Sequence, residues 1–388
     1  MSGKGRSAVV WLWAAMAASC GGCAQILGAD WSSYAHGEGA GGAGGPECSA
    51  DEATCSEDTP QRCVDGRWED APPCPAAAPV CDGGKCTTPP SCAGLAATCG
   101  PTGKESCCAT RAVPGGSFLR QTDDGMDHPA TVSAFLLDRF EVTFGRFRKF
   151  VEAYPGSLPA VGAGAHPGMP GSGWGETWSI EDAELPEDAA DLNSHLHCDP
   201  DFDLWTDEAG DDEQLPMLCM SWYLASAFCA WDGGRLPTEA EWYFAAAGGD
   251  EQRTFPWSDP ADSTEIDEDH AVYDCMGDRV ADDGCTLSDI QPVGSRSQQG
   301  DGKWGHADLA GSMWEWVLDW RGDYPEPCDD CANMEEAAVG EEGESERVIR
   351  GGGFHKDEVF QRSSHRNSYP PSVRYSHVGV RCARTPWP

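Results

Sequence analysis

The chain has 388 residues, which is enough for two or three domains. Its 65 acidic residues far exceed its 26 lysines and arginines, so the formal net charge is −39. A chain this acidic repels nucleic acids and anionic lipid surfaces, and we exclude both as partners. Its 20 cysteines are too many for an unmetallated cytosolic protein and indicate disulfides formed in an oxidising compartment.

The N-terminus has the pattern of an export signal. A short basic region is followed by the apolar stretch 8–18, which is too short to span a bilayer. Small residues then lead to Cys20 and Cys23, as in a bacterial lipoprotein signal, in which the cysteine after the cleavage point is lipidated. An ordinary secretory signal with two incidental cysteines is the alternative. We expect residues 1–23 to be a signal peptide and the exported protein to be held at the cell envelope by a lipid anchor.

Two short regions separate this signal from the main part of the chain. Residues 24–47 are predicted to be a flexible, glycine-rich linker. Residues 48–108 contain many cysteines and almost no aliphatic sequence, so they need disulfides to hold a shape. The sequence does not select a pairing. A zinc site is not favoured, because ligand-type CxxC pairs and histidines are missing here. The cysteines are Cys48, Cys55, Cys63, Cys74, Cys81, Cys86, Cys92, Cys99, Cys107 and Cys108.

The main domain, residues 112–388, begins with an extended, β-rich stretch. Thr143 is then expected to cap a helix, and Ser221 to begin another. Residues 155–216, which lie between the two helices, are acidic, rich in Gly and Pro, and aperiodic. They are predicted to form a long surface excursion. The first helix should bury one face made of Phe144, Phe147, Val151 and Tyr154.

The segment RLPTEAEW, residues 235–242, has strong local signals. Leu236 precedes a proline and is therefore extended. Thr238 and Glu241 have the spacing of a capping box, which predicts a helix over residues 240–247. Gly248 and Gly249 should end that helix.

The main domain resembles the formylglycine-generating enzyme, or sulfatase-modifying factor, family. Nine segments stand in the family's order, among them VPGGSF, RLPTEAEWYFAAAGG, DLAGSMWEWVLDW, RVIRGGGF and VGVRCA. The resemblance implies a single α+β domain with an irregular C-type-lectin-like fold, preceded here by the small disulfide-rich region. It also implies that Arg235, Glu239 and Glu241 hold the scaffold together and do no chemistry.

The family's enzymes oxidise a cysteine of a target sulfatase with oxygen. Two active-site cysteines shortly after an RGGS motif bind copper(I), because soft thiolates suit a soft metal. This chain reads RGGGFHKDEVFQRSSHRN there and has no cysteine between Gly353 and Cys382. We therefore expect no copper site. His355, His365 and Arg366 lie where the family builds its substrate groove. They are candidates to bind an acidic or peptide ligand, or to act as acid and base; packing residues are the alternative.

The resemblance implies one disulfide, Cys229–Cys382. A second family bridge would use the positions of Ala246 and Ser363, which are not cysteines here. We expect local pairings for the remaining cysteines of the domain, which would leave none free for catalysis. These pairings are Cys198–Cys219, Cys275–Cys285 and Cys328–Cys331.

The resemblance also implies a structural Ca²⁺ site in DLAGSMWE. Its hard oxygen ligands would be the side chains of Asp308 and Glu315 and the carbonyls of Gly311 and Met313. The alternative is a solvated aspartate and a buried glutamate paired with an arginine. The family's other calcium site falls in residues 272–285. Val272 replaces a common asparagine there, which leaves Asp274 and Asp283 as candidates only.

Two other sites are weighed and not favoured. His195, His197 and Cys198 alternate and could share a face, but Cys198 is expected to be bridged. The nonheme-iron branch of the family takes its iron ligands mainly from an extra helical domain, and no segment of this sequence resembles that domain.

Two functions remain. The first is a non-catalytic envelope lipoprotein that binds a protein, peptide or glycan ligand. The second is an oxidoreductase that modifies a protein or peptide cysteine, or another substrate, through a non-standard site.

Overall fold

The computed structural model describes residues 48–49, 53–56, 59–72, 74, 80–82, 84–121, 126–175, 178, 185–280, 284–336 and 344–386. The predicted signal peptide and linker, with Cys20 and Cys23, therefore lie outside the described residues. None of the described helices combines the length and apolarity needed to cross a membrane.

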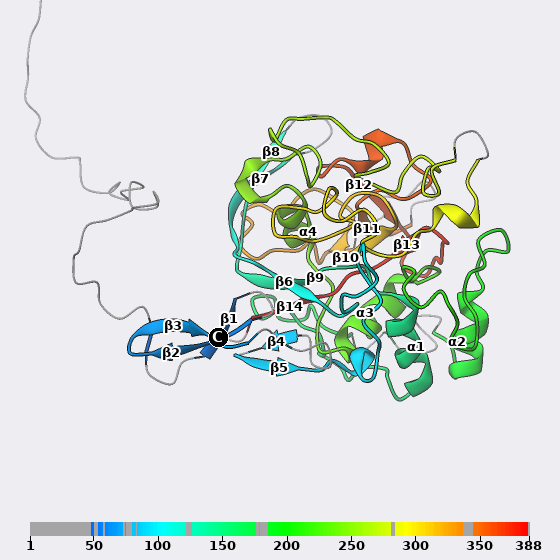
Figure 1. Cartoon of the computed structure of the whole chain (residues 1–388), viewed down its shortest axis with the longest axis horizontal. Coiled ribbons are helices and arrows are strands. Elements are labelled where there is room, and N and C mark those ends of the chain that lie inside the picture. The colour runs from blue at the N-terminus through cyan, green and yellow to red at the C-terminus, as the bar shows by residue number, and fades with distance from the viewer. Residues whose placement is uncertain are drawn as a thin grey trace, which may run out of the picture. The chain divides into compact units, whose positions relative to one another are not determined.

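The disulfide-rich region predicted before the main domain is confirmed. It forms two small antiparallel sheets (Figure 1). The side chains of Cys55 and Cys81 lie outside the described part. The strands are β1 (Ala53–Ser56), β2 (Thr59–Val64), β3 (Arg67–Asp70), β4 (Val80–Asp82) and β5 (Lys85–Thr87). The described disulfides are Cys48–Cys63, Cys74–Cys86, Cys92–Cys108 and Cys99–Cys107.

The main domain is built on a four-stranded sheet in the order β12-β11-β10-β13. Every residue of β10 is buried, which is possible because both faces of the sheet are covered. Strand β13 runs parallel to β10, whereas β11 and β12 are antiparallel to their neighbours. The strands are β10 (Trp314–Trp320), β11 (Arg347–Arg350), β12 (Arg366–Tyr369) and β13 (Val378–Gly379).

Two smaller sheets complete the strands, and one of them joins the two ends of the domain. Its order, β14-β9-β6, places the last strand of the chain beside two strands from the start of the domain. The other is the hairpin β7-β8. The strands are β6 (Thr110–Val113), β7 (Gly116–Gln121), β8 (Asp127–Val132), β9 (Phe135–Asp138) and β14 (Ala383–Arg384).

The helices begin where their capping residues predict. Thr143 caps α1, Ser221 caps α3, and the capping box of Thr238 and Glu241 opens α4. All eight residues of α4 are buried, because this helix packs against both the β7-β8 hairpin and the central sheet (Figure 1). The mixed α+β class predicted from the sequence is thus confirmed. The helices are α1 (Phe144–Ala153), α2 (Ala189–Leu196), α3 (Trp222–Trp231) and α4 (Glu239–Ala246).

The prediction that residues 155–216 form only a surface excursion is wrong. This stretch contains α2, and its Leu192 and Trp205 are almost completely buried in the main core. Trp205 packs edge-on against Phe144 of α1, with ring centroids 5.5 Å apart. The apolar residues of the stretch are too widely spaced to show a period, yet they fill the core next to α1.

A buried network of four charges connects the ends of the domain. Arg146 donates to Asp138 and to Asp232, each at 2.7 Å. Arg384 donates to Asp232 at 2.9 Å and also to Asp138. The backbone N–H of Ser91 donates to Asp232 at 3.0 Å, so the disulfide-rich region joins the same network. Two positive and two negative charges balance, as burial requires.

Removing one member of this network should destabilise the domain strongly. Asp232→Ala leaves Arg146 and Arg384 without half of their negative charge, and we expect it to cost about 3–5 kcal/mol of unfolding free energy. Glu152→Gln in the surface pair with Lys149 is the control and should change it by less than about 1 kcal/mol. Urea unfolding of the full-length chain measures both. Equal effects would contradict the role given to the network.

Candidate functional site

The candidate site follows the RGG motif, where β11 ends. Gly351 and Gly352 have φ values of 98° and 77°, which turn the chain sharply out of the sheet. A Cβ on Gly352 would lie 2.8 Å from the carbonyl oxygen of Phe360 and would also meet Oε1 of Gln361, so this turn, with its positive φ, requires glycine here. The chain then passes through Phe354 and His355 to a short 3₁₀ helix, Glu358–Gln361.

Gln361 closes this loop from within. Its buried amide nitrogen donates to the carbonyls of Gly353, Lys356 and Asp357 at 3.3, 3.0 and 3.2 Å. No thiol is present in this fully described segment. Gln361 therefore serves the shape of the loop.

Four side chains form an imidazole–aromatic patch beside the loop: His355, Tyr369, Tyr375 and His377. The rings of His355 and His377 have centroids 4.4 Å apart, and Tyr375 stacks on His377 at 5.1 Å. The hydroxyl of Tyr369 lies 3.3 Å from Nε2 of His377. Tyr375 is 39% exposed, so part of the patch faces solvent.

Both imidazoles of the patch are neutral near pH 7. Burial, followed by the charge of Lys356, lowers the pKa of His355 to about 4. Burial and the neighbouring His355 lower the pKa of His377 to about 3. The patch therefore offers flat rings and nitrogen lone pairs, and these imidazoles carry no positive charge.

The three residues predicted to line the groove have different surroundings. His355 belongs to the patch, whereas His365 packs against Phe360, with ring centroids 4.8 Å apart. Arg366 donates twice to Glu239, at 2.8 and 2.6 Å, and its side chain is largely buried. Its guanidinium supports α4. The scaffold contacts of Arg235 are similar, since it donates to both oxygens of Glu241.

The structure joins the cysteine pairs expected in the main domain: Cys229–Cys382, Cys198–Cys219, Cys275–Cys285 and Cys328–Cys331. Every cysteine whose side chain is described forms a disulfide. At the position of the missing family bridge, the hydroxyl of Ser363 donates to the carbonyl of Ala246 at 3.2 Å. The Cys275 N–H donates to the carbonyl of Phe354, so the Cys275–Cys285 disulfide lies next to the candidate loop.

The residues expected to bind calcium are buried, and one of them is already paired. Both oxygens of Glu315 accept from Arg381 at 2.6–2.8 Å, and one also accepts from Nε1 of Trp242 at 2.7 Å. Asp308 accepts from the N–H of Gly294, and burial raises its pKa to about 6. The oxygen donors suit calcium by their hardness. Because Arg381 neutralises Glu315, Asp308 is the carboxylate left for a cation.

A third buried acid at this place was missed from the sequence. Glu141 accepts from the N–H of Met313 and from the hydroxyl of Ser312, each at 2.9 Å. Burial and the charges of Asp308 and Glu315 raise the pKa of Glu141 well above its usual range. Its position before the cap of α1, far from the DLAGSMWE motif, gives no sequence signal of this contact.

The other candidate metal ligands do not gather. Nδ1 of His197 is hydrogen-bonded to a carboxylate oxygen of Asp203 at 2.7 Å, and Cys198 forms a disulfide with Cys219. Asp274 is exposed, and Asp283 lies outside the described residues. Within the described ranges, no group of three or more His, Cys, Asp or Glu side chains could hold a metal ion.

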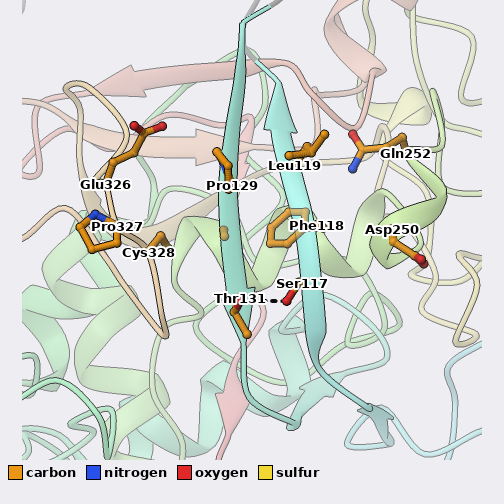
Figure 2. Close-up of a pocket in the computed structure, with 11 residues that line it drawn as sticks. Ser117, Phe118, Leu119, Pro129, Thr131, Asp250, Gln252, Glu326, Pro327 and Cys328 are labelled. Atoms are coloured by element: carbon orange, nitrogen blue, oxygen red, sulfur yellow. Dashed lines mark hydrogen bonds between the residues drawn. The ribbon is translucent and has the colours of Figure 1, made fainter. Parts of the chain in front are cut away.

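Two pockets differ in their relation to the patch. A pocket of about 410 Å³ is lined by His195, His197 and Tyr375, so it continues from the patch. A larger one of about 830 Å³ lies on the β7-β8 hairpin (Figure 2). There Asp250 and Gln252 lie on one side and Glu326 to Cys328 on the other, and Ser117 is hydrogen-bonded to Thr131 at 2.9 Å.

Comparisons with known proteins cover nearly all of the main domain. The family profile described as "Sulfatase-modifying factor enzyme 1-like domain" matches residues 96–386. An inactive C-alpha-formylglycine-generating enzyme 2 of Mus musculus is 32% identical over 222 residues, 53% of this chain and 67% of that protein. A formylglycine-generating enzyme of Thermomonospora curvata is 28% identical over 304 residues, 71% of this chain and 93% of that protein. The solved structure of PvdO from Pseudomonas aeruginosa is 23% identical, with a TM-score of 0.45 over 71% of this chain and 94% of that one.

The half-buried imidazole of His377 should make the domain labile to acid. Its pKa in the folded state is lower than in the unfolded state, so the folded state binds fewer protons. Stability is then complete above about pH 6.5 and falls as the pH drops toward 3, by an amount on the order of 3 kcal/mol at pH 4. His377→Gln should reduce this acid-dependent loss in urea unfolding, whereas His270→Gln at the surface should not. An unchanged acid profile in His377→Gln would contradict the assignment.

Proposed function

Since the chain belongs to the family of sulfatase-modifying factor enzyme 1-like domains, we propose that it is an exported member that binds a ligand without the copper-dependent oxidation. The family and the formylglycine-generating-enzyme-like fold predicted from the sequence are confirmed. The observation that carries the proposal is the loop after the RGG motif, where no thiol is present and every described cysteine nearby is bridged.

The chemistry of the loop supports this choice. Copper(I) that must also accept a substrate thiol and oxygen requires soft ligands. Here the amide nitrogen of Gln361 donates to three carbonyls, and the two imidazoles of the patch pack against each other. A relative that is named inactive further supports a branch of the family without catalysis.

The surface offered to a ligand is the patch together with the pocket at His195 and His197. Half-exposed aromatic and imidazole rings stack on peptide side chains or sugar rings, and a concave neighbour adds contact area. The chain would bind this protein, peptide or glycan ligand at the cell envelope. The many disulfides indicate an extracellular or otherwise oxidising location. Attachment through a lipid on Cys20 or Cys23 is part of this proposal.

The experiment combines catalysis and binding on the secreted full chain. With copper(I), oxygen and a cysteine-containing sulfatase-type peptide, we expect no oxygen uptake and no change in peptide mass. The Thermomonospora curvata enzyme under the same conditions is the positive control. Conversion of the thiol to an aldehyde would overturn the proposal.

Binding is tested by passing envelope proteins, peptides and glycans over the immobilised chain. Tyr375→Ala should weaken retention at least tenfold, because it removes the most exposed ring of the patch. Leu119→Ala is matched in exposure, at 38%, but lies in the hairpin pocket and should retain the ligand. If Leu119→Ala loses the ligand and Tyr375→Ala retains it, the ligand binds in the pocket of Figure 2 and not at the patch.

An enzyme with a non-standard site is the second candidate. It is favoured by one observation, the Cys275–Cys285 disulfide next to Phe354. Cys285 is exposed, so a reductant could reach it and release two thiols beside the patch. If turnover is seen, a Cys275→Ser/Cys285→Ser variant should abolish it. Turnover that persists would exclude this pair.

We further propose that Asp308 retains a structural calcium ion with the carbonyls of Gly311 and Met313. Calcium would offset the buried negative charge of Glu141 and Asp308, which exceeds what Arg381 balances. Millimolar calcium should raise the melting temperature by roughly 5 °C or more over a chelator. Asp308→Asn keeps an oxygen ligand and should retain the shift, and Asp308→Ala should lose it. If calcium does not raise the melting temperature of the wild-type chain, the proposed calcium site is wrong, and Glu315 serves only as the partner of Arg381.

A further inference from the structure

Four arginines gather beside α4 in a protein that is otherwise strongly acidic. This arginine cluster consists of Arg120, Arg321, Arg350 and Arg366, which come from β7, the end of β10, β11 and β12. Arg120 and Arg350 are almost completely buried, whereas Arg321 is partly exposed. None of the candidate sites described above uses the cluster as a whole.

Tyr324 lies at the centre of the cluster. The guanidinium groups of Arg120 and Arg366 lie over its ring, 4.4 and 4.3 Å from the centroid. The residue is 6% exposed, and its hydroxyl has no hydrogen-bond partner among the described residues. Burial raises the pKa of Tyr324 to about 12, so this hydroxyl stays protonated and available to donate.

In the described part of the chain, the carboxylates near the cluster do not neutralise its positive charge. Glu239 is held by Arg366 and lies 3.5 Å from Arg350. Asp319 accepts from the backbone N–H groups of Glu239 and Asn333, each at 2.7 Å. Burial, followed by the charge of Glu239, raises its pKa to about 7, so it carries less than a full charge at neutral pH. Four guanidinium charges therefore face fewer than two carboxylate charges.

Two of the arginines have no ion-pair partner in the described residues. No described carboxylate oxygen lies within 4 Å of the guanidinium nitrogens of Arg120 or Arg321. The nearby Glu326 is bound instead by His128 at 2.6 Å, and His128 itself packs against Tyr324. Burial lowers the pKa of Arg321, and the charges of Arg366 and Arg350 add to this effect, whereas the charge of Glu239 opposes it.

Unused donors remain in the cluster. Nε of Arg120, Nη1 of Arg321, Nε of Arg350 and the hydroxyl of Tyr324 are buried atoms without a described partner. All four atoms are hydrogen-bond donors, and three of them belong to positively charged guanidinium groups. A buried cation without a partner is costly, and so is a buried donor without an acceptor. A small anion with several oxygens bound here would supply both negative charge and hydrogen-bond acceptors.

We propose that this cluster is a binding site for a small oxyanion, namely a carboxylate, sulfate or phosphate group. Arg321 forms its solvent-facing side, and the hydroxyl of Tyr324 donates from within. Guanidinium groups bind such oxyanions through charge-assisted and often paired hydrogen bonds. The oxyanion could be a free ion or a group on a larger ligand. The site does not depend on the function proposed for the imidazole–aromatic patch.

The experiment measures anion binding to the full secreted chain. Sulfate, phosphate and acetate are titrated by calorimetry, and melting is followed in each salt and in chloride at matched ionic strength. Arg321→Gln removes the accessible charge, and Tyr324→Phe removes only the hydroxyl while keeping the ring. Arg279→Gln is the control, because Arg279 is exposed and paired with Asp269 elsewhere on the surface.

We expect at least one oxyanion to bind wild-type and Arg279→Gln equally, and Arg321→Gln at least tenfold more weakly. Tyr324→Phe should weaken binding several-fold. In chloride, Arg321→Gln should melt no lower than wild type, because it removes an unpaired charge. The preferred ion shows whether a planar carboxylate or a tetrahedral group fits. A shift shared by all four proteins would be a general salt effect and would overturn the proposal. Absence of binding in wild type would do the same.

Discussion

Buried arginine–carboxylate pairs hold this domain together, because its short strands and helices leave most of the backbone irregular. Arg381 and Glu315 fix the central strand β10, and Arg235 and Glu241 fix the entry to α4. In each pair the guanidinium has planar, repeated contacts with the carboxylate, which sets orientation as well as distance. Losing one partner leaves a buried charge unpaired, so such pairs strongly favour a single arrangement of the loops.

Local features of this fold could be predicted from the sequence, and distant ones could not. The caps at Thr143, Ser221 and Thr238 depend on residues a few positions away. The partners of Arg146 are mostly far along the chain: Asp232 is 86 residues away. Hydrophobic periodicity carries no information about such pairing. It also fails for Leu192 and Trp205, which are buried without forming a periodic stretch.

The same distinction between local features and distant contacts applies to the candidate site. The absence of thiols is visible in the RGGGFHKDE segment itself. The meeting of His355 with His377, 22 positions later, depends on how β13 returns to β10. Arg366 seemed equivalent to His365 in sequence, but only the fold shows that its guanidinium belongs to Glu239. Glu141 was missed for the same reason, since its contacts with Ser312 and Met313 span more than 170 positions.

These contacts also restrict the chemistry of a ligand at the patch. Arg366 is paired and the imidazoles of His355 and His377 are neutral at pH 7, so the positive charge near the patch comes from Lys356 and from Arg374 in the adjoining pocket. The net charge of −39 repels anions at long range and attracts cations. The arginine cluster avoids this conflict because it is buried, where the anion is held by short contacts. We therefore expect the rings of the patch to prefer neutral ligands with exposed rings, and acidic groups to bind more tightly where the guanidinium groups are collected around Tyr324.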